Sequence, residues 1–323
     1  MKKHLIAAAV AGAFAVPAMA QVTLSGNVGY AYETFEQANE KSSGIRNTDG
    51  QLVATVNEDL GGGLSVVYSG AVQWGRHRDA AVTFRDSTIT LRGGFGSLMI
   101  GSVEAGNGIQ PLGGAGAPVR GLGDETYSGL ATRAISAPGA VDTINFTLPK
   151  FGGVTVNVQR AEVGAARFGE KADDVKGGTA WIVGATYASG PITARIDQTW
   201  FADVTALNND RDRTRISGNV NLGAVVIGAG YQTIAYKGSA NVGAKDENHM
   251  IVGVNVPMGA LAFGVNYTTN EQKERTGGDI TGLDLGVAYS LSKRTTLGLQ
   301  HQQVENDANA EGTMTRVRLL HSF

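Results

Sequence analysis

Leu261-Ala262-Phe263-Gly264-Val265-Asn266-Tyr267 places an aliphatic or aromatic side chain at every second position, with Ala, Gly and Asn between them. A period of two is typical of a β-strand, whose successive side chains point to opposite faces. The stretch follows Pro257-Met258-Gly259-Ala260, in which Pro and Gly favour a turn. These residues therefore predict a strand with one apolar face and one face of small or polar side chains, reached through a tight turn.

The same period recurs along the chain. Val22-Thr23-Leu24-Ser25, Ile144-Asn145-Phe146-Thr147-Leu148 and Val154-Thr155-Val156-Asn157-Val158 all repeat it. Counting such segments gives about sixteen strands, an even number that suits a bacterial β-barrel. They start near residues 22, 45, 63, 82, 97, 141, 153, 178, 191, 213, 224, 248, 260, 280, 295 and 312.

The connections between these segments are of two kinds. Short turns alternate with longer polar connections, and this asymmetry is typical of outer-membrane barrels. The predicted short turns are Asp59 to Gly62, Gly93 to Gly96, Pro149 to Gly152, Ser189 to Pro191, Leu222 to Ala224, Pro257 to Gly259 and Ser292 to Arg294.

The beginning of the chain reads as an export signal. Lys2-Lys3 precedes an apolar stretch from Leu5 to Val16, and Ala18-Met19-Ala20 supplies a small-x-small cleavage site. The apolar stretch is shorter than the about twenty residues that a membrane-spanning helix needs. We therefore expect residues 1–20 to be a signal peptide and residues 21–323 to form one barrel.

Composition removes several classes of protein. The chain has no cysteine, so it has neither disulfides nor a thiolate metal site. The net charge of -2 does not favour a nucleic-acid partner. After the signal no apolar run is long enough for a spanning helix, which leaves the closed barrel as the membrane option.

A soluble β-sandwich or propeller is the alternative for many short strands. It is disfavoured because the polar face is built mainly from small neutral residues, as a water-filled lumen allows, and because aromatics gather near strand ends. The aromatics expected on the lipid-facing side are Tyr30, Tyr32, Tyr68, Trp74, Trp181, Tyr187, Trp200, Tyr231, Tyr236, Tyr267 and Tyr289.

Several motifs, in order and spacing, resemble the general-diffusion porins of Gram-negative outer membranes, particularly the trimeric sixteen-stranded type. The resemblance covers nearly the whole mature chain and ends on the terminal Phe323. Its motifs are Gln21-Val22-Thr23-Leu24-Ser25-Gly26, Glu58-Asp59-Leu60-Gly61-Gly62-Gly63-Leu64, Gly93-Gly94-Phe95-Gly96-Ser97, Leu148-Pro149-Lys150-Phe151-Gly152-Gly153 and Tyr289-Ser290-Leu291-Ser292-Lys293-Arg294-Thr295.

The resemblance implies an all-β transmembrane barrel of about sixteen antiparallel strands that serves as a passive pore in the bacterial outer membrane. It also implies a homotrimer, contact with membrane lipid and lipopolysaccharide, and no cofactor. Phe323 resembles the C-terminal signal that the outer-membrane assembly machinery reads in this family. Its other role is that of a lipid-facing residue on the last strand.

The longest connection runs from about Glu104 to Ala140 and is rich in glycine. Loops of this length in a compact fold are functional or disordered. In the porins that the chain resembles, the third loop folds into the lumen and narrows it, and its acids face basic residues of the wall. That resemblance assigns Glu104, Asp124, Glu125 and Arg133 to the constriction, while a flexible surface loop remains the alternative.

Alternation within strands predicts which charged residues face the lumen. Val317, Leu319, His321 and Phe323 share one phase of the last strand, so the other phase turns inward. The residues predicted to face inward are Arg195, Asp197, Arg213, Arg215, Asp284, Arg316 and Arg318, with a position at the barrel rim as the alternative for each.

Arg85 matches a wall arginine of the family, but Ile89 and Leu91 are in phase with it. An inward Arg85 therefore needs a bulge or another break of phase between them. The chain also departs from the family at positions that often carry a basic residue, where it has Asn27, Gln51 and Ser102. This thinning of the basic ring suggests a weakly polarised constriction with weak ion selectivity.

Two other functions compete with a general pore. A barrel enzyme is disfavoured, because the five histidines lie in no visible arrangement with a nucleophile and a base. A substrate-specific channel is the nearer rival. Such sugar channels usually carry aromatics along the lumen, whereas the aromatics of this chain fall mainly on the lipid phase.

Overall fold

The computed structural model describes residues 21–37, 40–74, 82–104, 140–163, 178–202, 210–237, 246–272, 279–306 and 312–323. At residues 104, 140, 210, 272 and 306 only the backbone is described. The predicted signal peptide 1–20 and nearly all of the predicted constriction loop, 105–139, lie outside these ranges. So do Asp124, Glu125 and Arg133.

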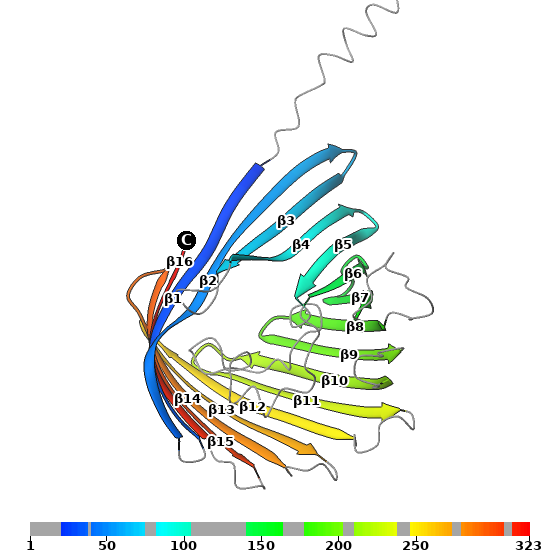
Figure 1. The fold of residues 1–323 in the computed structure, drawn as a ribbon. Helices are drawn as coiled ribbons and strands as arrows, with labels where there is room; N and C mark the ends of the chain where they lie inside the picture. Colours follow the sequence, from blue (N-terminus) through cyan, green and yellow to red (C-terminus); the bar gives the residue numbers. More distant parts are fainter. Residues whose placement is uncertain are drawn as a thin grey trace, which may run out of the picture.

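The described ranges hold sixteen strands, which agree with the predicted number and form an all-β fold (Figure 1). The strands are β1 Gln21–Gln37, β2 Glu40–Gly61, β3 Leu64–Trp74, β4 Val82–Gly93, β5 Gly96–Glu104, β6 Ala140–Thr147, β7 Val154–Glu162, β8 Thr179–Ser189, β9 Ile192–Ala202, β10 Asp210–Asn221, β11 Val226–Lys237, β12 Glu247–Met258, β13 Leu261–Gln272, β14 Ile280–Ser290, β15 Thr295–Asn306 and β16 Gly312–Ser322.

The sheet is a closed antiparallel barrel in which each strand pairs with its neighbours in the sequence, and β16 returns to pair with β1 (Figure 1). At the seam, Tyr30 lies opposite Leu319 and Glu33 opposite Arg316. Closure gives every strand two partners, so the sheet has no free edge along its paired length, as a membrane-spanning sheet requires.

The seven predicted short turns all lie between paired strands, at one end of the barrel. Glycines with positive φ occupy several of them, among them Gly62 (φ 62°) and Gly223 (φ 81°), where a side chain would be strained. The first connection differs from the prediction. Because Gln37 pairs with Glu40, β2 begins about five residues earlier than expected and only residues 38–39 separate it from β1.

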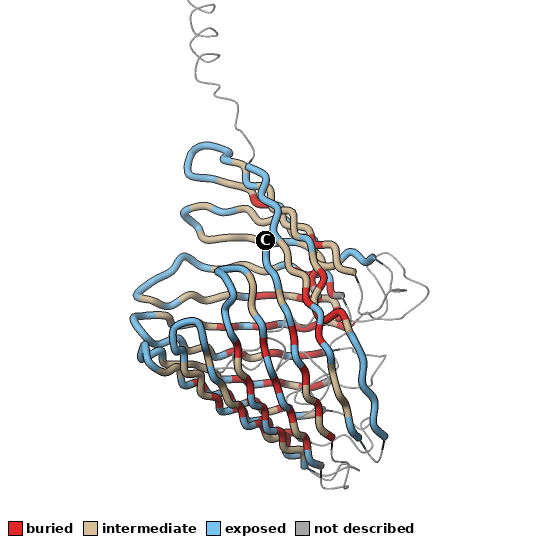
Figure 2. The backbone as a smooth tube through the Cα atoms, turned by 90° about the vertical axis from the view of Figure 1, so that its left-hand side faces the viewer, coloured by how far each residue is buried: buried red, intermediate tan, exposed pale blue. Residues whose placement is uncertain are grey.

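Burial alternates along the strands with the predicted period of two (Figure 2). On β10, Arg213 and Arg215 are buried, while Ile216 is 54% exposed. In a closed barrel, exposed apolar side chains lie on the convex outside, so the buried polar phase faces the interior. The buried residues concentrate away from the short turns, most of whose residues are exposed (Figure 2).

Most aromatic side chains lie on the outer face, among them Trp181, Trp200 and Tyr289. Tyr236 was expected there too, and that expectation is wrong. It is in phase with the buried Ile234 and its hydroxyl donates to Glu247 Oε1 at 3.1 Å. A tyrosine can face inward when its hydroxyl has a partner of this kind.

Among the described residues, no helix is long and apolar enough to span a bilayer.

Candidate functional site in the barrel interior

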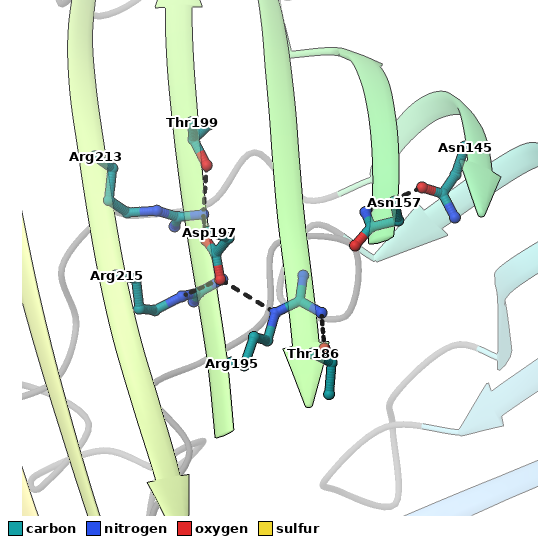
Figure 3. Close-up of polar contacts among 8 residues, drawn as sticks. All are labelled: Asn145, Asn157, Thr186, Arg195, Asp197, Thr199, Arg213 and Arg215. Atoms are coloured by element: carbon teal, nitrogen blue, oxygen red, sulfur yellow. Dashed lines mark hydrogen bonds and ion pairs between the residues drawn. The ribbon is translucent and has the colours of Figure 1, made fainter. Parts of the chain in front are cut away.

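One carboxylate on the inner wall is surrounded by three guanidinium groups (Figure 3). Arg215 donates from Nε to Oδ2 of Asp197 at 3.0 Å and from Nη2 to Oδ1 at 3.0 Å. Arg195 donates from Nε to the same Oδ2 at 3.2 Å, and Nη2 of Arg213 lies 4.0 Å from Oδ1. Asp197 is therefore the only acid in a group dominated by positive charge, among the residues drawn in Figure 3.

Strand register builds this group. Asp197 on β9 lies directly opposite Arg215 on β10, and Thr199 lies opposite Arg213. Directly opposed side chains on one face of an antiparallel pair are close enough to bond. Arg213 accordingly donates from Nη2 to Thr199 Oγ1 at 3.1 Å.

The arginine row continues one step further to Arg211, which the sequence analysis did not single out. Its guanidinium carbon lies 4.7 Å from the centre of the Phe201 ring, and that of Arg213 lies 5.9 Å from the same centre. Arg211 is in phase with Arg213 and Arg215, so extending the alternation by two residues would have found it. A buried aromatic ring against these cations could not be inferred without the register.

A second charged group lies half-way round the barrel, where β16 meets β1 and β2. Nη1 of Arg316 lies 3.6 Å from Glu33 Oε1, and Arg46 donates from Nη1 to Glu33 Oε2 at 3.2 Å. Arg318 donates from Nη1 to Asp49 Oδ2 at 3.4 Å. Here two carboxylates face three guanidinium groups, so the excess of positive charge is smaller than in the group around Asp197.

Polar contacts extend this second group along β15 to β14. Arg316 donates from Nε to Gln300 Oε1 at 2.6 Å. Gln300 and Gln302 donate from Nε2 to the two carboxylate oxygens of Asp284, at 3.0 and 2.9 Å. The buried Asp284 thus accepts a hydrogen bond from a neutral amide on each of its two carboxylate oxygens.

A third polar group lies on β11 and β12 and was missed by the sequence analysis. Glu247 accepts from Tyr236, and its Oε2 lies 3.1 Å from Nε2 of His249. His249 and Glu247 are both buried. Alternation on β12 could have indicated them, because Met250 and Val252 occupy the opposite, exposed phase.

The register of β4 shifts where the sequence required a break of phase for an inward Arg85. Gly70 pairs with Ser87 and Val72 pairs with Phe84, so Arg85 and Asp86 together oppose one residue of β3. Phe84 is 91% exposed, which puts it on the outer face. Arg85 directly follows it and is half-buried, and it has a partner of its own.

The three positions where the basic ring is thinned do not all lie on the inner face. Asn27 lies opposite Gln51, and both are in phase with inward residues. Ser102 is in phase with the exposed Ile100 and donates to Asp142 Oδ1, so it belongs to the outer phase of β5. The absence of an arginine at Ser102 therefore removes no charge from the interior.

Two predicted site residues at the limits of the strands remain. Glu104 ends β5, and its side chain is outside the described part of the structure. Phe323 follows β16; its ring centre lies 6.5 Å from that of His321, and both residues are exposed on the outside. Within the described ranges, no group of three His, Asp or Glu residues is arranged to hold a metal ion.

The comparisons with known proteins agree with this geometry. The family model described as Gram-negative porin matches residues 7–309. The fold is similar to that of an anion-selective porin from Comamonas acidovorans, with TM-score 0.73, 22% identity and coverage of 94% of this chain and 100% of the other. A search of curated protein sequences gave no match.

Two other solved structures show the same fold at lower identity. The outer-membrane channel DcaP of Acinetobacter baumannii has TM-score 0.67 and 13% identity, covering 94% of this chain and 97% of its own. The trimer form of in-vitro folded OmpT from Vibrio cholerae has TM-score 0.66 and 13% identity, covering 94% and 99%. The chain therefore belongs to the Gram-negative porin family, whose members are diffusion channels of the outer membrane rather than enzymes.

Proposed function

We propose that the pore lets ions and small hydrophilic solutes cross the membrane by passive diffusion, with no energy-consuming step. One observation supports this most directly: the closed barrel has an exposed apolar outside and an inner face lined by arginines, acids and amides. Such an interior hydrates small solutes, and its charges bias which ions enter.

The narrow part of the pore, in this proposal, is made by the segment from about Glu104 to Ala140 and the walls that face it. Glu104, Asp124, Glu125 and Arg133 supply charges from the segment. The wall supplies Arg85, Arg195, Asp197, Arg316 and Arg318, of which the last four belong to the two charged groups described above. The size limit would be set by this segment.

The proposed ion selectivity is weak, with anions favoured. Near Glu33 and Asp49, two carboxylates offset most of the charge of three guanidinium groups, which gives little preference there. The wall around Asp197 carries an excess of guanidinium groups, which attract anions. Opposite walls of unequal charge produce a field across the pore, although salt screens it where the lumen is filled with water.

Planar-bilayer recording of the refolded protein tests this function. The intact chain should give steady single-channel currents, and a variant with residues 105–139 replaced by a short glycine-serine linker should conduct more. A deletion that leaves conductance and solute size limit unchanged would remove the constriction role from this segment.

A substrate-specific channel is the second candidate, and the inward Tyr236 and Phe201 favour it to a small extent. Most aromatic residues nevertheless lie outside, where they cannot guide a solute. Liposome swelling separates the two functions. Entry rates that fall only with the size of neutral sugars support general diffusion, whereas one sugar that enters far faster than others of its size supports a specific channel.

We also propose that the barrel works as a homotrimer in contact with lipid and lipopolysaccharide. OmpT of Vibrio cholerae, which shares the fold, is described in a trimer form. The exposed apolar belt offers the surface that lipid or a neighbouring barrel would cover. In the same proposal, the outer-membrane assembly machinery binds Phe323 during insertion, and the exposure of this residue directly after β16 supports that role.

A further inference from the structure

The inner wall formed by β10 and β11 carries hydrogen-bond donors that lack an acceptor. Nε of Arg211, Nε of Arg213 and Nε2 of Gln232 are buried and bond to nothing in the described structure. The three residues are 3%, 4% and 2% exposed. Since buried donors in folded proteins are nearly always paired, three unmet donors on adjacent strands require an explanation.

These donors lie on one patch of the wall. Arg211 and Arg213 occupy successive inward positions of β10 and share the Phe201 ring. Gln232 on β11 lies opposite Arg215, which makes it the diagonal neighbour of Arg213. Diagonal residues of an antiparallel pair are about 7–8 Å apart, within reach of side chains of this length.

The acids of this wall bond elsewhere. Asp197 already accepts three hydrogen bonds from Arg195 and Arg215, and it is 4.0 Å from the terminal nitrogen of Arg213. Glu247 is contacted by Tyr236 and His249. Neither carboxylate reaches the Nε atoms of Arg211 or Arg213.

We propose that Arg211, Arg213 and Gln232 bind the oxyanion group of a small solute, such as a phosphate or a carboxylate, against the β10–β11 wall. All three unmet atoms are donors, and two belong to cations. An oxyanion accepts several hydrogen bonds at once, and its charge and shape are complementary to guanidinium groups. A cation would be repelled, and a neutral hydroxyl would not neutralise the charge of the two arginines.

The ring of Phe201 helps to preorganise this site, because it contacts both arginines before any ligand binds. Both guanidinium carbons lie over the ring, at 4.7 and 5.9 Å from its centre, and a ring in this position attracts cations without accepting the Nε–H groups. The low exposure of the patch also weakens solvent screening, so a bound anion interacts more strongly than it would at the rim. The inference rests on the proposed passive pore and adds a retention step for one class of solute.

Two measurements on the folded full chain test the site. In planar bilayers, inorganic phosphate added to a chloride solution should reduce single-channel current in a saturable way, and acetate should do so if carboxylates bind too. Calorimetry of the detergent-solubilised barrel with inorganic phosphate measures binding without any current. A barrel that binds phosphate but passes no ions would contradict the proposed pore and leave the site standing.

Three variants distinguish a specific binding site from general attraction of anions by the positive charge of the wall. Arg213→Lys keeps the charge but loses Nε, and Gln232→Leu changes no charge. Both should weaken phosphate block about tenfold while reversal potentials in a potassium chloride gradient stay as in the wild type. Arg46→Lys on the opposite wall, at a residue outside both the proposed site and the narrow part of the pore, is the matched control and should leave the block unchanged.

The proposal is overturned if phosphate block does not saturate, or if Arg213→Lys and Gln232→Leu bind and block as the wild type does. In that case water molecules accept hydrogen bonds from the three donors, and anions respond only to the general positive field of the wall. Should either variant fail to fold, Arg211→Lys provides the same comparison at the neighbouring position.

Discussion

Gly26 and Phe323 exchange two backbone hydrogen bonds, each 3.0 Å long, and so complete the barrel at the end of the chain. The Phe323 ring lies directly over Gly26. A Cβ atom at Gly26 would lie 2.7 Å from Cζ of that ring and 2.3 Å from the carbonyl oxygen of Gln51. Closure of the seam therefore depends on a residue without a side chain at this position.

Gly26→Val should destabilise the barrel by about 1–3 kcal/mol, because the new side chain must displace both the ring and the backbone of β2. The loss is measured as a lower temperature at which the folded form disappears on a gel run after graded heating. Gly44→Val is the matched control, since a Cβ there meets nothing within 4 Å. Equal losses for both variants would contradict the role of the Phe323 contact.

Phe323→Ala separates folding from assembly. The ring is exposed on the outer face, so refolding of the purified chain into detergent should change little. In cells, the variant should reach the outer membrane in clearly lower amounts if Phe323 is the residue that the assembly machinery reads. Normal amounts in the membrane, measured by quantitative blotting of outer-membrane fractions, would argue against that role.

The fold could be predicted because its determinants are local. A period of two and glycine-rich turns are visible within ten residues, so the strand number and the seven short turns were predicted correctly. The start of β2 was less accurate. Glu40-Lys41-Ser42-Ser43 is polar throughout and shows no alternation, and it becomes strand only because it pairs with the end of β1.

The interior could be predicted only in part. Alternation indicates on which face Arg316 and Arg318 lie, but not that Glu33 and Asp49, nearly the whole chain away, are their partners. The register across the seam decides those contacts, and no local pattern contains it. The face on which Arg85 lies also depends on strand pairing. Arg85 and Asp86 together oppose one residue of β3, and this bulge reverses the alternation for the residues of β4 that precede it.

Asp197→Asn tests the charge balance of the arginine wall. The substitution removes the only carboxylate that Arg195 and Arg215 contact in the described structure, so the wall becomes more positive. We expect a reversal potential shifted toward anions in a potassium chloride gradient, together with lower stability, because three guanidinium groups then repel each other. Asp284→Asn is the comparison, since it removes an inward carboxylate that accepts from two amides on another wall of the barrel. A larger shift for Asp284→Asn than for Asp197→Asn would contradict this account.

Gly184→Ala tests whether the position of Arg195 matters. A Cβ at Gly184 would lie 2.8 Å from Nη2 of Arg195 and 2.7 Å from Oδ1 of Asn157. Both are ends of side chains and can move, so stability should fall only slightly. The displaced guanidinium should lose its bonds to Thr186 and Asp197, and single-channel conductance in dilute salt should change. Unchanged conductance would indicate that Arg195 does not border the narrow part of the pore.

Glu33→Gln tests the charged seam, where one carboxylate contacts guanidinium groups from β2 and β16. Removing that charge leaves Arg46 and Arg316 facing each other with little water to screen them. We expect a loss of up to about 3 kcal/mol in unfolding free energy, measured by denaturant titration in detergent.

Glu36→Gln is the matched control three residues along the same strand. Its ion pair with Lys41 is exposed, with 57% and 72% of the two side chains accessible, so its loss should cost about 0–1 kcal/mol. The contrast should persist in 1 M salt, because screening weakens exposed pairs far more than buried ones. Equal effects of the two substitutions would mean that the seam is held by backbone pairing alone.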